Sequence, residues 1–299
     1  MYSILLIITG ALVIPGIIIR TRSLLSGRKG PGMFQPWHNL LLLARKGSVF
    51  SRSSGLIQQA APSLMLSSIL AAALLVPGAG KSGILSFPFD FVVFAGLMAL
   101  SRFLLVLAAL DAGSSFEGMG ASREALYGIL AEPSFFMLTG ALAVFTGHDT
   151  FSSLFNALPG HTLGYYAATL PAMYVLFIIM IIETGRIPVD DPRTHLELTM
   201  IHEVMVLDLS GIDLAILQLA GYIKFGIFSS LIAACATQAS WSVPVQLAFG
   251  LAVQGLNAVS IGVLESFRAR NRMNKNPQYI LAITAVSLLI FMLAILTLI

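Results

Sequence analysis

The sequence predicts an all-α integral membrane protein, with about eight transmembrane helices in one domain that covers residues 1–299. Hydrophobic residues make up 57% of the 299 residues, charged residues only 10%, and the mean hydropathy is +0.89. A soluble domain carries about 25% charged residues, so ordinary soluble enzymes and nucleic-acid-binding proteins are excluded despite the pI near 9.1. The apolar residues form unbroken runs, whereas a membrane β-barrel needs alternating segments of about 10 residues.

Eight apolar runs are long enough to cross a bilayer as helices. The expected spans are 2–19, 60–77, 88–111, 124–146, 163–183, 213–236, 243–264 and 278–299. The first run has no basic residues before it and ends at Arg20 and Arg22 rather than at a small-residue cleavage site. We therefore expect a retained helix and not a cleaved signal peptide.

The distribution of basic residues predicts the orientation of these spans. Fourteen of the 17 Lys and Arg residues lie in the loops after spans 1, 3, 5 and 7, whereas the loops after spans 2, 4 and 6 contain only Lys81. Cytoplasmic loops of membrane proteins are enriched in Lys and Arg. The odd-numbered loops are therefore expected in the cytoplasm, with both termini outside.

Two cytoplasmic loops are expected to carry amphipathic surface helices. In the first loop, Trp37 and a run of leucines suit an interfacial helix over 36–46, which either binds anionic lipid or contacts a soluble partner. In the fifth loop, Pro188 and Pro192 force a turn, and a helix is expected from about 194 to 206.

Three charged residues lie deep inside predicted spans. Arg102, Glu132 and Lys224 each lie about 12–17 Å from the inner end of their span, at the helical rise per residue. Charges at such depth are costly and mark functional sites by default. They form a proton-relay cluster, a structural ion pair or a contact to a helix of a neighbouring subunit, and Glu132 is expected to point into the bundle with a cation near it.

The fifth loop is strongly acidic. Half of the 14 Asp and Glu residues of the chain lie between Glu183 and Asp213, which favours proton handling or docking over a merely solvated surface. His195 and His202 are seven residues apart, but the HExxH spacing of zinc helices is missing. A metal site is therefore disfavoured.

Several motifs together are similar to a known family. The order Gly120-Ala-x-Arg123, Glu132, Glu183-Thr-x-Arg186-x-Pro188-x-Asp190, Glu197 and Ser210-Gly211 resembles the first membrane subunit (subunit 1) of respiratory complex I. Within that superfamily, Leu107-x-x-Leu-Asp111-x-Gly-Ser-x-Phe116, Gly120-Ala-Ser-Arg-Glu124 and His195-Leu-Glu-Leu-Thr-Met-Ile-His-Glu203 resemble the membrane subunit of group 4 nickel–iron hydrogenases, the formate hydrogenlyase and hydrogenase-4 type.

This resemblance implies a non-catalytic subunit of a prokaryotic inner-membrane complex. Its expected partners are the hydrogenase large and small subunits, iron–sulfur subunits and antiporter-like membrane subunits, with the nickel–iron centre and the clusters held by those partners. No cofactor or metal is expected in this chain, whose only cysteine is Cys235. The candidate residues for proton handling or coupling are Glu132, Arg102, Lys224, Asp111, Arg123, Glu183, Arg186, Asp190, Asp191, Glu197, His202, Glu203 and Asp208.

Two alternatives stay open. The chain could be the quinone-site subunit of a complex I-type enzyme, which would need a cavity open to lipid near the first surface helix. Arg193, His195 and Asp208-Leu209 stand where complex I members usually carry further carboxylates and a Glu-Tyr pair, which favours the hydrogenase branch. A stand-alone ion transporter is disfavoured because the sequence shows no inverted repeat.

Overall fold

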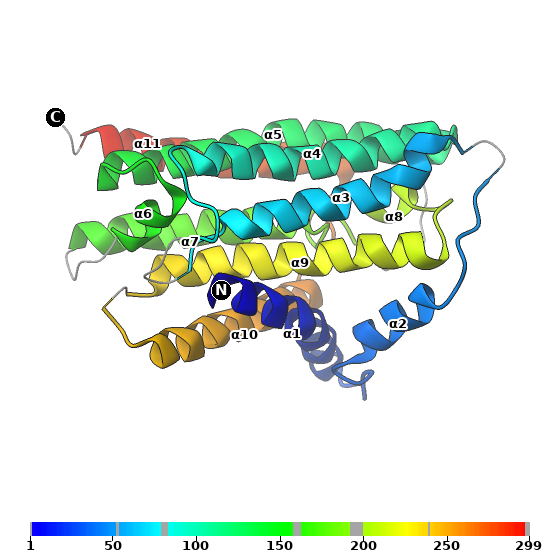
Figure 1. Cartoon of the computed structure of the whole chain (residues 1–299), viewed down its shortest axis with the longest axis horizontal. Coiled ribbons are helices and arrows are strands. Elements are labelled where there is room, and N and C mark those ends of the chain that lie inside the picture. Colours follow the sequence, from blue (N-terminus) through cyan, green and yellow to red (C-terminus); the bar gives the residue numbers. More distant parts are fainter. Residues whose placement is uncertain are drawn as a thin grey trace.

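The computed structural model describes residues 2–51, 54–78, 83–157, 163–191, 200–238 and 240–296. Within these ranges every regular element is a helix, which confirms the predicted all-α class (Figure 1). The long helices are α1 (Tyr2–Leu25), α3 (Leu56–Leu75), α4 (Asp90–Asp111), α5 (Ser115–Thr146), α7 (Leu163–Glu183), α9 (Gly211–Ala236), α10 (Val243–Phe267) and α11 (Asn276–Leu296). The short ones are α2 (Gln35–Ala44), α6 (Phe151–Asn156), α8 (His202–Met205) and the 3-10 turn η1 (Met273–Lys275).

Each predicted span coincides with a long helix. Seven helices in the described part of the chain are long and apolar enough to cross a membrane. The remaining predicted span, 163–183, corresponds to α7, whose described apolar part, Thr169–Glu183, is shorter. The chain is therefore a multi-pass membrane protein, and its direction across the membrane stays a prediction.

Helix α5 begins earlier than the sequence suggested. It starts at Ser115, one residue after the extended Ser114, whereas the predicted span began at residue 124. Gly113, with φ of +73°, turns the chain between α4 and α5. The residues between 115 and 123 are too polar to count as a span, but they continue the helix and pack against α8.

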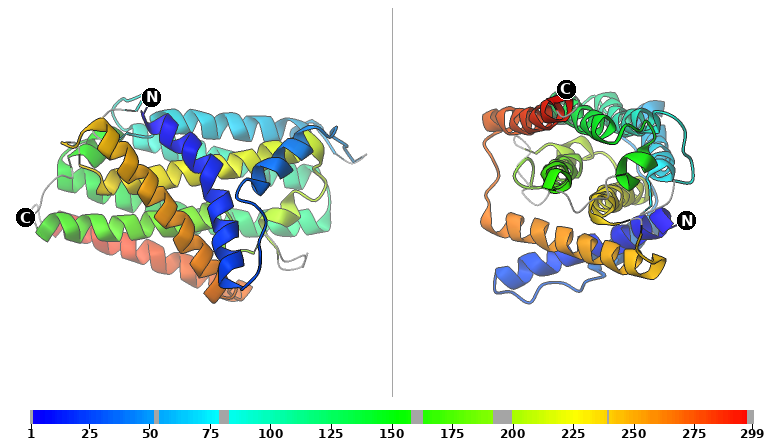
Figure 2. Two further views of the ribbon diagram at one scale, coloured as in Figure 1. Left: turned by 90° about the horizontal axis from the view of Figure 1, so that it is seen from below. Right: turned by 90° about the vertical axis from the view of Figure 1, so that its left-hand side faces the viewer.

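The helices form layers around α7 and α9. In the end-on view, α4, α5 and α11 lie along one outer edge, α1 and α10 lie along the opposite edge, and α7 and α9 lie between them (Figure 2, right). Helices α1 and α10 cross the others obliquely (Figure 2, left). Helix α9 is the most buried span, with 72% of its most apolar window inside the bundle. Charged side chains on α7 and α9 therefore face protein rather than lipid.

Polar side chains join the crossing helices. The Gln254 side chain of α10 donates to the Leu6 carbonyl of α1 at 2.8 Å, and the Asn257 side chain donates to the Ser229 hydroxyl of α9 at 3.0 Å. Lipid tails are as apolar as leucine, so such interhelical hydrogen bonds and close packing hold membrane helices together. The Asn257–Ser229 bond joins α10 to α9, which carries Lys224.

The structure confirms one of the two predicted surface helices and differs from the other where it is described. The first is confirmed as α2, where Trp37 Nε1 donates to the Leu12 carbonyl of α1 at 2.9 Å. The predicted helix over 194–206 falls partly on residues 192–199, which lie outside the described residues. Its described part contains only the four-residue α8, because the Asp190 side chain accepts the N–H groups of Ile201 and His202 and holds them outside a longer helix.

Candidate functional site: a buried charge cluster

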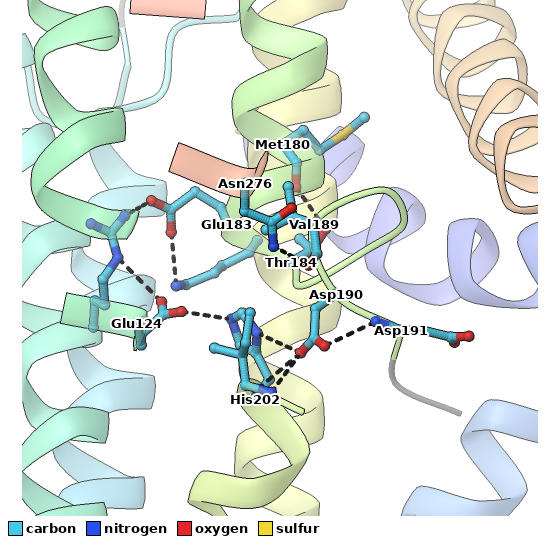
Figure 3. A network of polar contacts seen from close by, with 12 residues as sticks. Glu124, Met180, Glu183, Thr184, Val189, Asp190, Asp191, His202 and Asn276 are labelled. Atoms are coloured by element: carbon cyan, nitrogen blue, oxygen red, sulfur yellow. Dashed lines mark hydrogen bonds and ion pairs between the residues drawn. The ribbon is translucent and has the colours of Figure 1, made fainter. Parts of the chain in front are cut away.

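The guanidinium group of a single arginine contacts three carboxylates. Arg102 of α4 lies 3.0 Å from Glu132 and 3.4 Å from Glu124, both on α5, and its Nη2 also contacts Glu183 at the end of α7. On the other side of Glu183, Lys224 Nζ of α9 lies 3.1 Å from Oε2. Four helices thus contribute to one charge cluster, which we define as Arg102, Glu124, Glu132, Glu183 and Lys224. Figure 3 labels two of its members, Glu124 and Glu183.

The side chains of the charge cluster differ in how far they are exposed. The side chains of Arg102, Glu124, Glu183 and Lys224 are less than 10% exposed, whereas that of Glu132 is 42% exposed. Buried charges are tolerated only when they are paired and hydrogen-bonded. The expected cation near Glu132 is present, but the expectation that Glu132 points wholly into the bundle is wrong, because its contact with Arg102 lies near the surface of the α4–α5 pair.

A glycine makes room for the guanidinium. A methyl group in place of the Gly128 hydrogen would collide with the Arg102 side chain. Glu124, Gly128 and Glu132 are spaced four residues apart on α5, so all three lie on one side of the helix. Sequence reasoning overlooked Glu124 and Gly128 as members of this site, although their spacing from Glu132 could have indicated them.

The turn after α7 is held by Asp190. Its Oδ2 accepts the backbone N–H groups of Ile201 and His202 at 3.2 and 3.0 Å, and its Oδ1 lies 3.2 Å from Arg270 Nη2. The Pro188 carbonyl accepts the N–H of Asn271 at 3.0 Å. The α10–α11 connection therefore fixes the geometry of this loop.

A further contact, from the start of α11, also holds the turn after α7; together with the contacts of Arg270 and Asn271 it forms a brace for this turn. The Asn276 side chain donates to the Val189 carbonyl at 2.9 Å and is completely buried (Figure 3). Sequence reasoning missed Arg270 and Asn276, since neither is close to the acidic loop in the chain. The two residues show that the loop is a fixed structure near Asp190 and not a free acidic segment.

His202 lies between the acidic loop and the charge cluster. Its Nδ1 is 3.5 Å from Asp190, and its Nε2 is 3.5 Å from Glu124 (Figure 3). Burial lowers the pKa of His202, but the charges of Glu124 and Asp190 outweigh it and hold that pKa above the ordinary value. Conversely, burial raises the pKa of Asp190, but His202 and Arg270 bring it below the ordinary value. The charged pair His202–Asp190 is thereby favoured.

Gly185 sits directly against the histidine ring. It has φ of +59°, and a side chain at this position would meet the ring of His202. A non-glycine residue would be strained by the left-handed backbone and would also displace the ring. The sequence Glu183-Thr-Gly-Arg therefore positions both a buried carboxylate and the approach to His202.

The remaining candidates are spread around this centre. Arg186 pairs with Glu265 of α10 at 3.2 Å and lies over the Phe225 ring, 5.1 Å from its centroid. Arg123 donates to the Met200 carbonyl, and Asp111 accepts the N–H of Gln58 at the start of α3. These contacts stabilise the loop and the helix ends and do not join the charge cluster.

Four further candidates lie apart from the charge cluster or outside the described residues. The Asp208 N–H donates to Glu117 at 3.2 Å, and Asp191 follows Asp190 in the braced turn. Glu203 lines the cavity described next, and Glu197 lies outside the described residues. Within the described part of the chain, no three His, Cys, Asp or Glu side chains are placed to hold a metal ion.

Two cavities border α9. The first, of about 190 Å³, is lined by charged residues of the cluster on one side and by apolar residues such as Leu217 and Phe225 on the other. The second, of about 550 Å³, is almost wholly apolar and lies between α1, α3 and α9, with Trp37 of α2 at its wall. Tyr222 lines the first cavity, and its ring centroid lies 6.1 Å from that of Trp37. The two cavities thus lie on either side of this aromatic pair.

Comparison with known proteins places these features in a family. The sequence profile described as NADH dehydrogenase matches residues 1–298. The chain belongs to the NADH dehydrogenase family. This family member is 32% identical to Hydrogenase-4 component C of Escherichia coli (strain K12) over 225 residues, which cover 73% of this chain and 68% of that protein.

A second relative supports the same branch of the family. The chain is 28% identical to Formate hydrogenlyase subunit 4 of the same organism, over 62% of this chain and 61% of that protein. Its fold is shared with a chain in the structure of the membrane-bound sulfane sulfur reductase, an archaeal respiratory membrane complex, with a TM-score of 0.79 at 17% identity. That match covers 97% of this chain and 98% of the other. The resemblance inferred from the motifs is therefore confirmed at the level of the family.

Proposed function

We propose that this NADH dehydrogenase family member is the membrane-anchoring and coupling subunit of a multisubunit nickel–iron hydrogenase. In this role it joins a peripheral electron-transfer arm to ion-translocating, antiporter-like membrane subunits. The similarity to Hydrogenase-4 component C and Formate hydrogenlyase subunit 4 supports the type of complex. The nickel–iron centre and the iron–sulfur clusters would belong to partner subunits, since this chain has one cysteine, which is buried in α9.

The observation that carries the coupling role is the continuity of charged groups from the braced loop to the middle of α5. Asp190, His202 and Glu124 follow one another at 3.5 Å, and Arg102 then contacts Glu124 and Glu132. A merely structural ion pair would need only one cation and one carboxylate. The series instead connects the loop region with a carboxylate that reaches the α4–α5 surface.

The shared guanidinium provides a physical means of coupling. When a proton binds Glu124, its attraction for Arg102 Nε weakens, and the positive charge is left to Glu183 and Glu132. The charges of the three carboxylates are thereby coupled, because they share one cation. A change of charge at the loop would in this way alter the electrostatic environment of Glu132, whose side chain is the most exposed of the cluster.

The coupling role is tested by neutralising Glu183 in the intact complex. In Glu183→Gln membranes we expect hydrogen turnover with little ion movement, measured together in inverted vesicles. Glu117→Gln is the matched control, since Glu117 is a buried α5 carboxylate that contacts the Asp208 N–H outside the charge cluster. Unchanged ion movement per turnover in Glu183→Gln, with a normally assembled complex, would contradict the proposal.

A second candidate function rests on the apolar cavity beside α2. Its position near the first surface helix is what the quinone-site alternative requires, and its volume of about 550 Å³ lies within the usual range for small-molecule sites. The test is the quinone content and quinone reductase activity of the purified complex. Bound quinone and a reductase activity that Trp37→Ala and Tyr222→Ala both lower would support this alternative. A quinone-free complex with hydrogenase activity would exclude it.

A further inference from the structure

The carboxylate of Glu132 reaches the outer surface of the bundle within the membrane span. In the predicted span 124–146, Glu132 lies eight residues after Glu124 and 14 before Thr146, about 12 and 21 Å along α5. The hydrocarbon core of a bilayer is about 30 Å thick. Glu132 therefore lies within the apolar part of the span, yet its side chain is 42% exposed.

A second polar group lies on the same face one turn away. Pro133 has no backbone N–H and cannot provide the usual helical donor to the carbonyl of Ile129, which is itself 69% exposed. Backbone and side-chain acceptors without donors are strongly penalised in hydrocarbon. The α5 surface thus presents the second oxygen of Glu132 where lipid has no donor to offer, and one turn earlier the Ile129 carbonyl lacks its usual helical donor.

The shape of this region also suits a neighbouring helix. A hollow of about 30 Å³ beside α4 and α5 is lined by the small residues Ala95 and Ala99, by Phe136 and by Glu132, and on its inner side by buried residues of α7 and α9 such as Ile179 and Phe228. Small residues allow helices to approach closely within a membrane. The hollow has roughly the volume of one water molecule, enough for the polar end of a side chain. We call Ala95, Ala99, Ile129, Glu132 and Phe136 the α4–α5 face; it lies along an outer edge of the bundle (Figure 2, right).

We infer that the α4–α5 face is covered by a transmembrane helix of another subunit, which places a cationic or amide side chain against the free oxygen of Glu132. The charge of the carboxylate selects a hydrogen-bond donor as its partner. A second copy of this chain is disfavoured, because a two-fold interface on this face would bring two Glu132 carboxylates together. The inference goes beyond the coupling role, since it concerns assembly and holds whether or not ions move.

The test is site-directed photocrosslinking in membranes that contain the complete complex. A photoreactive phenylalanine replaces Ile129 in a tagged full-length chain, and the adduct is identified by mass spectrometry. We expect the crosslinked peptide to lie in an apolar spanning segment of a different subunit, with Lys, Arg, His, Asn or Gln within one helical turn. The matched control is Leu256 of α10, which is 65% exposed and lies on the opposite edge, and it should not give this adduct.

A second arm tests the role of the carboxylate. Glu132→Gln keeps an acceptor oxygen and should retain the Ile129 adduct, whereas Glu132→Lys opposes a cationic donor and should lose it. Chain levels in the membrane report whether each variant is inserted. Adducts confined to lipid, to a second copy of this chain, or to a segment with only apolar side chains would overturn the inference, and none of these readouts depends on hydrogenase turnover.

Discussion

The ammonium group of Lys224 lies 3.1 Å from Oε2 of Glu183, while the other oxygen of the same carboxylate contacts Arg102. Glu183 therefore accepts from two cations that come from different helices, α9 and α4. Because all three side chains are less than 10% exposed, each charge depends on the others for its solvation. We call this group of Glu183, Arg102 and Lys224 at the end of α7 the Glu183 junction.

Removing one cation from this junction should destabilise the protein. Lys224→Met leaves Glu183 with Arg102 alone, and we expect the free energy of unfolding to fall by about 3 kcal/mol, as for other broken buried pairs. Adding Glu183→Gln should recover a substantial part of the loss, because the uncompensated charge is then removed. A double-mutant cycle of thermal unfolding in detergent measures this coupling, and strictly additive effects would contradict it.

The space at Gly128 should be essential for the position of Arg102. Gly128→Ala places a methyl group against the guanidinium, so we expect poor assembly and loss of coupled turnover. Gly118→Ala on the same helix is the control, since nothing lies within 4 Å of its added methyl group. That control should gain up to about 1 kcal/mol from helix propensity. Equal behaviour of the two variants would show that Arg102 does not need this space.

Stability should depend on the protonation of His202. Its folded-state pKa is raised, so its contribution is complete below the unfolded value of about 6.5 and is lost as the pH rises through the folded-state pKa. Asp190 has a lowered pKa and loses its contribution only in stronger acid, so it does not mask this change. His202→Gln should flatten the decline of the unfolding temperature from neutral to alkaline pH. A parallel decline in wild type and variant would refute the assignment.

The orientation is tested with single cysteines. A cysteine at Asn156, the last residue of α6, should react with an impermeant reagent from outside intact cells. A cysteine at Asn274, in the α10–α11 connection, should react only after the inner face is opened. The native Cys235 is buried in α9, so it should give little background. Labelling at Asn274 from outside would reverse the predicted topology.

The sequence predicted the depth of each charged residue in the membrane but not the side of the helix on which its side chain lies. Arg102, Glu132 and Lys224 could be placed at similar depths by counting residues, and the structure brings Arg102 to Glu132 and both cations to the same cluster. Rotation about each helix axis depends on packing, which hydropathy alone does not encode. For this reason the partial exposure of Glu132 was not foreseen.

Contacts between segments that are distant in the chain could not be predicted from the sequence either. Arg270 and Asn276 follow the acidic loop by about 80 residues, and only the fold brings them to Asp190 and Val189. The short α8 replaces the described end of a predicted longer helix because Asp190 captures two N–H groups, a side-chain effect that periodicity does not report. By contrast, the spans and α2 were predictable because long apolar runs and an interfacial Trp37 leave few alternatives.

The contacts between the α10–α11 connection and the turn after α7 can form only late in biosynthesis. Asn271 and Asn276 secure the turn at Pro188 and Val189, but they are translated only after seven of the eight long helices. A nascent chain that has inserted α7 therefore carries the acidic loop without its anchors until the α10–α11 connection has been translated. The surface around Asp190 acquires its final form only then, so a peripheral arm that recognises this surface would bind chains that contain the connection and pass over shorter ones.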